Sequence, residues 1–477
     1  MHRVIAILAT MNLAAGQFNF LNEVNKISFN PIDSFKAKMN EITVSVVENP
    51  TVQNINDRTG EAISKTINAG SAVPNSIASA IGYYHIPTIE SNVNLMEYND
   101  IKFMADYNAG LHNEDAKLGT VELITKYGFP AETHIVETED GYRLKMHRIP
   151  GNGSVVFLMH GLFGSANDYL VAGPESALAY ELAREGYDVW MGNARGNTHS
   201  RAHRTLQPSE KKFWDFSWHQ IGVHDLPAMI DFVLKTTNST KLKYVGFSQG
   251  TTSFFVMASE RPEYNEKISV MVALSPVAFM SNMKSPVIRL FVPGQPIYES
   301  IVKTVGAHEF APDNLLTRSV KRTVCGVTKI SEILCSNIVF LTVGFDMPQL
   351  NVTNLPVVFA HEPAGAATNQ MIHYGQGVRS GDFAHFSYGT FTNERVYGNK
   401  VPPSYKVEQV TAPVALMYSD GDWMADVTDV RKLASKLSNV VEDYLVPFHG
   451  FNHLDFIIAR DVKTLVYDKV KYVLKKY

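Results

Sequence analysis

A serine on a glycine-flanked turn is the strongest chemical signal in this sequence. The segment Gly246-Phe247-Ser248-Gln249-Gly250 lies between a short β-prone run, 242–245, and an apolar run with helical character, 251–258. The two glycines allow a sharp turn without a Cβ clash, and such a turn exposes the serine oxygen. The unpaired N–H groups at the start of the following helix suit a developing oxyanion. The pattern therefore predicts that Ser248 is a nucleophile.

A serine nucleophile needs a base, and the base needs an acid that orients it. A predicted buried strand at 412–418 is followed by three aspartates, Asp420, Asp422 and Asp426. We expect Asp420 to shape the turn and Asp426 to cap or pair with the next helix. Asp422 is therefore the candidate acid.

Two histidines are candidates for the base. A second predicted strand, 441–446, leads to His449 and His453, which lie four residues apart. Both follow the nucleophile and the acid in the chain, as a base in this arrangement would. Spacing alone does not separate them.

An earlier strand offers a donor for the oxyanion. The near-continuous apolar run 154–159 is typical of a parallel strand covered on both faces, and His160-Gly161-Leu162 follows it. A His-Gly turn there can direct the Leu162 N–H toward the oxyanion, beside the Gln249 N–H. One such donor typically contributes about 2.7–4 kcal/mol to the stability of the transition state. The alternative is a simple turn from strand to helix.

The order serine, aspartate, histidine on a strand–turn–helix frame is typical of an α/β-hydrolase. Strand and helix patterns alternate over 114–275, with a helix expected over Asp225–Lys235, Asp225 near its cap and Pro227 in its first turn. We expect an α/β core, 114–275 and 411–477, around a mostly parallel central sheet. Residues 276–410 would form an inserted, largely helical cap or lid.

From about Asp115 to the C-terminus the chain resembles the acid lipase family of gastric and lysosomal lipases. The resemblance covers the opening of the predicted core, the segments around the serine and the final aspartate and histidine segments. It rests on Tyr127-Gly128-Phe129-Pro130, Val136-Glu137-Thr138-Glu139-Asp140-Gly141-Tyr142, Gly192-Asn193-Ala194-Arg195-Gly196-Asn197-Thr198, Phe213-Trp214-Asp215-Phe216-Ser217-Trp218, Asp225-Leu226-Pro227-Ala228, Ser259-Glu260-Arg261-Pro262, Pro363-Ala364-Gly365, Asp422-Trp423 and His453-Leu454-Asp455-Phe456.

The resemblance implies a role for each candidate residue. Ser248 would be the nucleophile, Asp422 the acid and His453 the base, with the N–H groups of Leu162 and Gln249 as the oxyanion hole. It also implies triacylglycerols or cholesteryl esters as substrates at a lipid–water interface, activity at acid pH and no cofactor. One departure stands out: the family usually has histidine before the serine, where this chain has Phe247.

Composition excludes some other classes of protein. The 477 residues carry a formal charge of −4 and 45% hydrophobic residues, which gives no reason to expect nucleic acid binding. A metal site is not expected, because His199 and His203 lie four apart without the glutamate of a His-Glu-x-x-His motif. The oligomeric state stays open.

The N-terminus predicts entry into the secretory pathway, toward the extracellular space, a gut lumen or the lysosome. Residues 1–16 have a positive start, a short apolar run and small residues typical of a cleaved signal peptide, and no stretch long enough for a transmembrane span follows. Residues 17–113 would be an N-terminal extension or propeptide. Asn152, Asn238 and Asn351 begin glycosylation sequons, and the resemblance implies a disulfide between Cys325 and Cys335.

The sequence thus predicts a serine lipase or esterase that acts on neutral lipids through an acyl-enzyme. Two other functions remain open. A catalytically silent hydrolase-fold protein could bind or carry lipid, and a carboxylesterase would act on short soluble esters only.

Overall fold

The computed structural model describes residues 100–289, 291–293, 309–310, 343, 346 and 348–477. These residues belong to one compact unit, Leu95–Tyr477. The predicted signal peptide, most of the predicted extension and both Cys325 and Cys335 lie outside the described residues.

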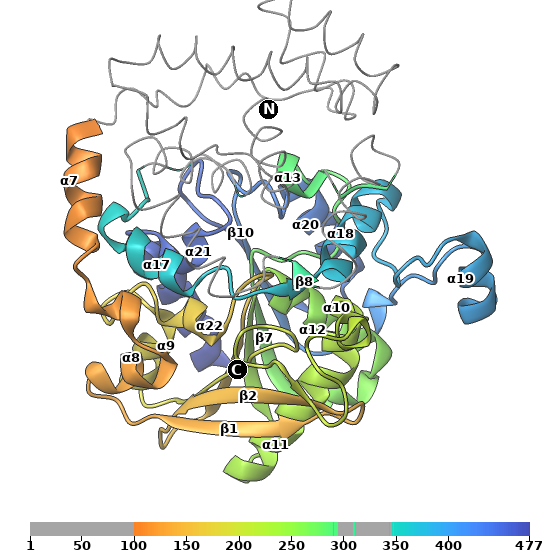
Figure 1. Cartoon of the computed structure of the whole chain (residues 1–477), viewed down its shortest axis with the longest axis horizontal. Helices are drawn as coiled ribbons and strands as arrows, with labels where there is room; N and C mark the ends of the chain where they lie inside the picture. The colour runs from red at the N-terminus through yellow and green to blue at the C-terminus, as the bar shows by residue number, and fades with distance from the viewer. Residues whose placement is uncertain (1–99, 290, 294–308, 311–342, 344–345, 347) are drawn as a thin grey trace, which may run out of the picture. The chain divides into compact units, whose positions relative to one another are not determined.

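The described chain is built around one nine-stranded sheet (Figure 1). Its order is β1-β2-β4-β3-β6-β7-β10-β11, with β5 paired to β2. Pairing is parallel from β4 through to β11 and antiparallel among β1, β2, β4 and β5, so the predicted mostly parallel sheet is confirmed. The strands are β1 Glu132–Glu137, β2 Tyr142–Ile149, β3 Val155–Met159, β4 Asp188–Met191, β5 Ala202–His203, β6 Leu242–Phe247, β7 Ile268–Leu274, β10 Val414–Tyr418 and β11 Val440–Leu445; β8 Glu309–Phe310 and β9 Ala366–Ala367 form a separate pair.

Alternation along the central strands divides the core into two layers. In β3, Phe157 and Met159 face one hydrophobic layer, whereas Val156 and Leu158 face the other. Successive side chains of a strand point to opposite faces, so a strand covered by helices on both faces is apolar at every position. All five residues of β3 are buried accordingly.

Helices cover both faces of the sheet, with α8, α9 and α22 on one side and α10 and α12 on the other (Figure 1). Their apolar residues complete the two layers. The helices are α7 Asp100–Gly110, α8 Thr120–Lys126, α9 Leu178–Arg184, α10 Trp218–Gln220, α11 Leu226–Thr237, α12 Gln249–Glu260, α13 Pro286–Arg289, α17 Leu355–His361, α18 Thr368–Ser380, α19 Thr390–Tyr397, α20 Val427–Lys436, α21 Asp455–Ile458 and α22 Asp468–Lys476.

The helix expected over Asp225–Lys235 is confirmed as α11, with Pro227 in its first turn. Asp225 directly precedes α11, at the cap position, as expected. Its backbone is already helical, because it is the last residue of the π-helical turn Ile221–Asp225, and its side chain makes no capping hydrogen bond. The carboxylate binds Arg195 instead.

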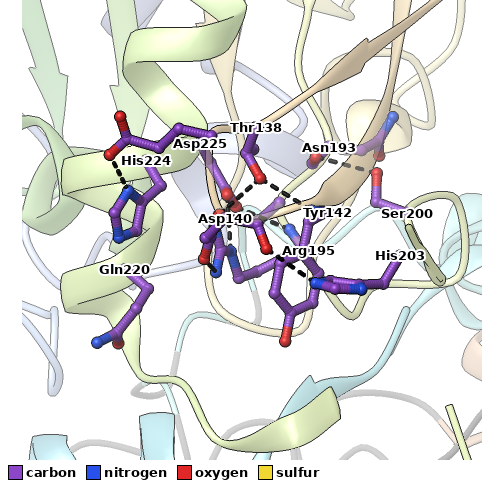
Figure 2. A network of polar contacts seen from close by, with 12 residues as sticks. Thr138, Asp140, Tyr142, Asn193, Arg195, Ser200, His203, Gln220, His224 and Asp225 are labelled. Carbon is purple, nitrogen blue, oxygen red and sulfur yellow. Dashed lines mark hydrogen bonds and ion pairs between the residues drawn. The ribbon is translucent and has the colours of Figure 1, made fainter. Parts of the chain in front are cut away.

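Arg195 is the centre of a buried ion network that fixes the loop after β4 (Figure 2). Its Nε donates to Asp225 Oδ1 at 2.7 Å, and its two terminal nitrogens bind both oxygens of Asp140 at 2.6 and 2.9 Å. The guanidinium also lies 4.0 Å from the ring centroid of Tyr142. Burial alone would raise the pKa of Asp140, but the Arg195 guanidinium lowers it to about 2. This loop is therefore held by charge as well as by packing.

The described part of 276–410 contains α13, α17, α18 and α19 and the short pair β8–β9. Figure 1 shows α13 and α18 above α10 and α12, and Gln370 of α18 donates to the Gln249 side chain at the start of α12, at 3.1 Å. Gly375 of α18 packs so closely on the Phe291 carbonyl that a Cβ would lie 2.0 Å from its oxygen. Helices of this segment thus pack on one another near the carboxyl ends of the strands.

Candidate active site

Ser248 lies on the sharp turn between β6 and α12, as the glycine pattern predicted. Its φ of 50° and ψ of −115° are unusual for a residue with a side chain. A Cβ on Gly246 would lie 2.8 Å from the Gly250 backbone, and a Cβ on Gly250 would lie 2.2 Å from the Met159 carbonyl oxygen. Gly246 therefore lets the turn close on the start of α12, and Gly250 lets it pack against the end of β3.

The structure brings Ser248, His453 and Asp422 together from three distant segments. His453 Nε2 lies 2.8 Å from Ser248 Oγ, and His453 Nδ1 lies 2.9 and 3.1 Å from the two oxygens of Asp422. All three side chains are buried. The geometry suits a base that takes a proton from the serine while the carboxylate fixes its orientation.

Asp422 is stabilised as a carboxylate in spite of its burial. Its Oδ1 accepts the N–H groups of Met424 and Ala425 at 2.7 and 2.9 Å. Burial raises the pKa of Asp422, but His453, Ser275 and the Ala425 N–H together bring that pKa below its ordinary value. A charged acceptor therefore faces the Nδ1 side of the imidazole.

The other histidine candidate makes a separate pair. His449 Nδ1 lies 2.7 Å from Asp420 Oδ2, and the His449 side chain is 88% exposed. Asp420 also accepts the Gly450 N–H, so it joins two loops as a turn-shaping residue would. Asp426 caps α20 through the Thr428 N–H, as expected.

Ser275 is a member of this site that sequence reasoning missed. It directly follows β7, and its Oγ lies 2.5 Å from Asp422 Oδ2 and 2.6 Å from His453 Nδ1. The residue is fully buried and has a φ of 49°. A serine at the carboxyl end of the strand next to β6 was the available signal.

The loop after β3 passes directly beside the serine. A Cβ on Gly161 would lie 3.2 Å from Ser248 Cβ, a tight contact that glycine avoids. His160 Nε2 accepts the Ala194 N–H, so the ring proton is on Nδ1, which donates to the Gly161 carbonyl. Burial lowers the pKa of His160, which favours this neutral form. Among the described residues, the N–H groups of Leu162 and Gln249 have no acceptor.

Phe247, the departure from the family pattern, packs inside the site. Its ring centroid lies 5.1 Å from that of His453, and a Cβ on Gly161 would meet its ring at 3.0 Å. The ring therefore separates the loop after β3 from the imidazole, where a histidine would add a polar atom.

Other predicted features can be located within the described residues. Asn152, Asn238 and Asn351 are all exposed. No group of three or more metal-ligating side chains gathers among the described residues. His203 instead contacts the Asp140 carbonyl, and His199 lies against the His147 ring. No described helix has the length and apolar character needed to cross a membrane.

A mostly parallel sheet with a serine on a strand–helix elbow defines the α/β-hydrolase class. The family described as "Partial alpha/beta-hydrolase lipase region" matches residues 120–173, and "alpha/beta hydrolase fold" matches residues 154–314. A solved structure from Sulfolobus solfataricus covers 72% of this chain and 94% of its own, at 15% identity and a TM-score of 0.51, and it supports the fold.

Two curated relatives show the family. Lipase 3 of Drosophila melanogaster is 47% identical over 366 residues, which are 75% of this chain and 92% of that protein. Human lysosomal acid lipase/cholesteryl ester hydrolase is 37% identical over 373 residues, 76% of this chain and 92% of that protein. The chain belongs to the family of gastric and lysosomal acid lipases, and it is a carboxylic ester hydrolase of the lipase type.

Proposed function

We propose that this enzyme hydrolyses esters of neutral lipids, triacylglycerol or cholesteryl ester, through an acyl-enzyme on Ser248. The observation that supports the mechanism is the 2.8 Å contact between Ser248 Oγ and His453 Nε2, backed by Asp422 on the other ring nitrogen. The substrate class is supported by relatives named gastric triacylglycerol lipase and lysosomal acid lipase/cholesteryl ester hydrolase.

Each step follows from this arrangement. Ser248 Oγ attacks the ester carbonyl while its proton passes to His453 Nε2, and the carbonyl oxygen becomes an oxyanion facing the N–H groups of Leu162 and Gln249. The imidazolium then donates that proton to the departing alcohol, which leaves an acyl group on Ser248. Water, deprotonated by His453, attacks the acyl carbonyl, and the collapse of the second intermediate releases the acid and restores the serine.

The proposed cap is residues 276–410. Its described helices α13 and α18 pack near the carboxyl ends of the strands, where a site of this class opens. A cap of this kind would cover the acyl chain of the substrate. Secretion or delivery to the lysosome is proposed from the same family, and the three exposed sequon asparagines are compatible with it.

Hydrolysis by the intact protein and by Ser248→Ala tests the proposal. The substrates are an emulsified long-chain triacylglycerol, an emulsified cholesteryl ester and a soluble short-chain ester, and circular dichroism confirms folding. We expect the variant to lose activity on the order of 10⁶-fold on every substrate that the intact protein hydrolyses. Equal rates from both proteins would exclude the mechanism, and turnover of the soluble ester alone would identify a short-chain esterase.

A further inference from the structure

Ser275 lies between the candidate base and the candidate acid and contacts both. Its Oγ lies 2.6 Å from His453 Nδ1 and 2.5 Å from Asp422 Oδ2, with no exposed surface. Its N–H donates to the Met417 carbonyl of the neighbouring strand β10 at 2.8 Å. The hydroxyl is thus fixed by backbone pairing as well as by its two partners.

The direction of the hydrogen bonds follows from the available acceptors. Asp422 Oδ1 accepts two backbone N–H groups and lies 3.1 Å from His453 Nδ1, whereas Oδ2 lies nearer to Nδ1, at 2.9 Å, and is the oxygen that Ser275 contacts. The single hydroxyl proton of Ser275 goes to Oδ2, because an ionised acceptor forms the stronger bond. The lone pairs of Oγ then face Nδ1 of His453, and the Nδ1–H is shared between Oγ and Oδ2.

This sharing affects how strongly the acid stabilises the protonated base. A carboxylate that receives the whole Nδ1–H favours the imidazolium and raises the pKa of a histidine. Ser275 weakens that effect in two ways: it donates a hydrogen bond to the carboxylate, and its neutral oxygen takes part of the Nδ1–H. Both changes favour the unprotonated imidazole, which is the form that accepts the proton of Ser248.

We propose that Ser275 is a positioning residue that divides the Nδ1–H of His453 between itself and Asp422, and so keeps His453 able to act as a base at lower pH. This inference rests on the proposed function, in which His453 is the base. It assigns to the serine after β7 a role in setting the pH range of hydrolysis.

Other charged groups near this site are the same in all the variants used to test the proposal. Asp455, at the start of α21, and Asp346 are neighbouring carboxyls, and burial raises the pKa of both. Asp426 pairs with Lys284 at 2.8 Å, and Asp420 pairs with His449. These groups affect the pH dependence of kcat/KM in every variant alike. A difference in that dependence between the intact protein and a Ser275 variant is therefore due to Ser275.

Ser275→Ala and Ser275→Gly test the proposal together. Both remove the hydroxyl, but glycine adopts the φ of 49° more easily than alanine, so a purely structural role would affect the two variants unequally. Ser419→Ala is the matched control: Ser419 directly follows β10, is fully buried, and its hydroxyl has no partner among the described residues.

The measurement is kcat/KM against pH on a soluble ester, with thermal unfolding of each variant. The acid limb is the part of the profile in which kcat/KM falls as the pH is lowered. We expect the midpoint of this limb to lie about one pH unit higher in both Ser275 variants. At a pH well below that midpoint, their kcat/KM should therefore be about tenfold lower than that of the intact protein. Ser419→Ala should match the intact protein at every pH. If alanine prevents folding, the glycine variant supplies the result.

An unmoved acid limb in a folded Ser275 variant overturns the inference. A shift of the acid limb in only one of the two variants, if that variant is also the less stable one, overturns it as well. Ser248→Ala, assayed in parallel, separates the two proposals: if it is inactive while the Ser275 limb is unmoved, the proposed function stands and only the role of Ser275 fails. An active Ser248→Ala means that the proposed function itself is wrong.

Discussion

Two aspartate–histidine pairs come from the same two loops and have almost the same geometry. Asp420 and His449 lie 2.7 Å apart with side chains 41% and 88% exposed, whereas Asp422 and His453 lie 2.9 Å apart with side chains 0% and 3% exposed. Only the buried pair reaches Ser248. Residue types and a short Asp–His contact therefore do not identify the candidate base. Burial and the contact with Ser248 distinguish His453 from His449.

The two aspartate–histidine pairs differ in how much water surrounds them. An exposed pair is screened by water and salt, and typically contributes about 0–1 kcal/mol to stability. A buried carboxylate loses hydration and must recover it from protein donors, as Asp422 does from two backbone N–H groups and Ser275. The exposed pair joins two loops, whereas the buried pair has the contacts that the proposed proton transfer requires.

Removal of each histidine in turn should give the largest difference between the two pairs. His453→Ala should lower kcat on the order of 10⁶-fold, because the serine loses its base. His449→Ala should leave kcat within about threefold, since its side chain contacts Asp420 and no contact links it to Ser248 among the described residues. The measurement is kcat on a soluble ester, taken from steady-state kinetics of variants with matched thermal stability. Comparable losses from both would mean that the loop as a whole, rather than burial, sets activity.

Removing the charge of each aspartate should give the next largest contrast. Asp422→Asn should lower kcat about 10⁴-fold while the fold persists, because an amide favours the wrong imidazole tautomer. Asp420→Asn should change kcat by less than about threefold. The readout is kcat at the plateau pH, with circular dichroism as the folding control. Full activity in Asp422→Asn would show that Asp422 is not the acid.

A smaller effect is expected from widening the contact that places both pairs. A Cβ on Gly421 would lie 2.2 Å from the Gly450 backbone, so Gly421→Ala must push the two loops apart. We expect a loss of about 1–3 kcal/mol in unfolding free energy, together with reduced activity. Gly389→Ala is the control, because its Cβ would meet nothing within 4 Å and only its positive φ is unfavourable. Unchanged stability and activity in Gly421→Ala would show that the loops tolerate separation.

Local patterns predicted much of this arrangement. The apolar runs of β3 and β10 belong to strands buried on both faces, so composition alone located them. The glycines around Ser248 predicted the elbow, because a close backbone approach excludes other residues. Such signals depend on neighbours in the chain, and the sequence displays those neighbours directly.

Contacts between distant segments were not predictable in the same way. His449 and His453 share one loop, and burial, which the spacing does not encode, separates them. Ser275 binds partners 147 and 178 residues away, and a serine after a strand carries no periodic signal. Asp225 had the local pattern of a helix cap, yet its partner Arg195 lies 30 residues earlier.

The smallest expected effect concerns the exposed pair and pH. Burial raises the pKa of Asp420, but the Gly450 N–H and His449 outweigh it and hold that pKa below its ordinary value. A carboxyl with a lowered pKa in the folded state stabilises the fold above its unfolded pKa of about 3.9, and this contribution disappears as pH falls through the folded value. The difference in unfolding free energy between the intact protein and Asp420→Asn should therefore shrink below about pH 4.

Urea unfolding at several pH values and at two salt concentrations measures that difference. The difference should also shrink at high salt, because the pair is exposed and salt screens it. A difference that persists at pH 2.5 and in high salt would mean that the Asp420 side chain stabilises the loops by packing rather than by charge. In that case the two pairs would differ in kind of interaction as well as in burial.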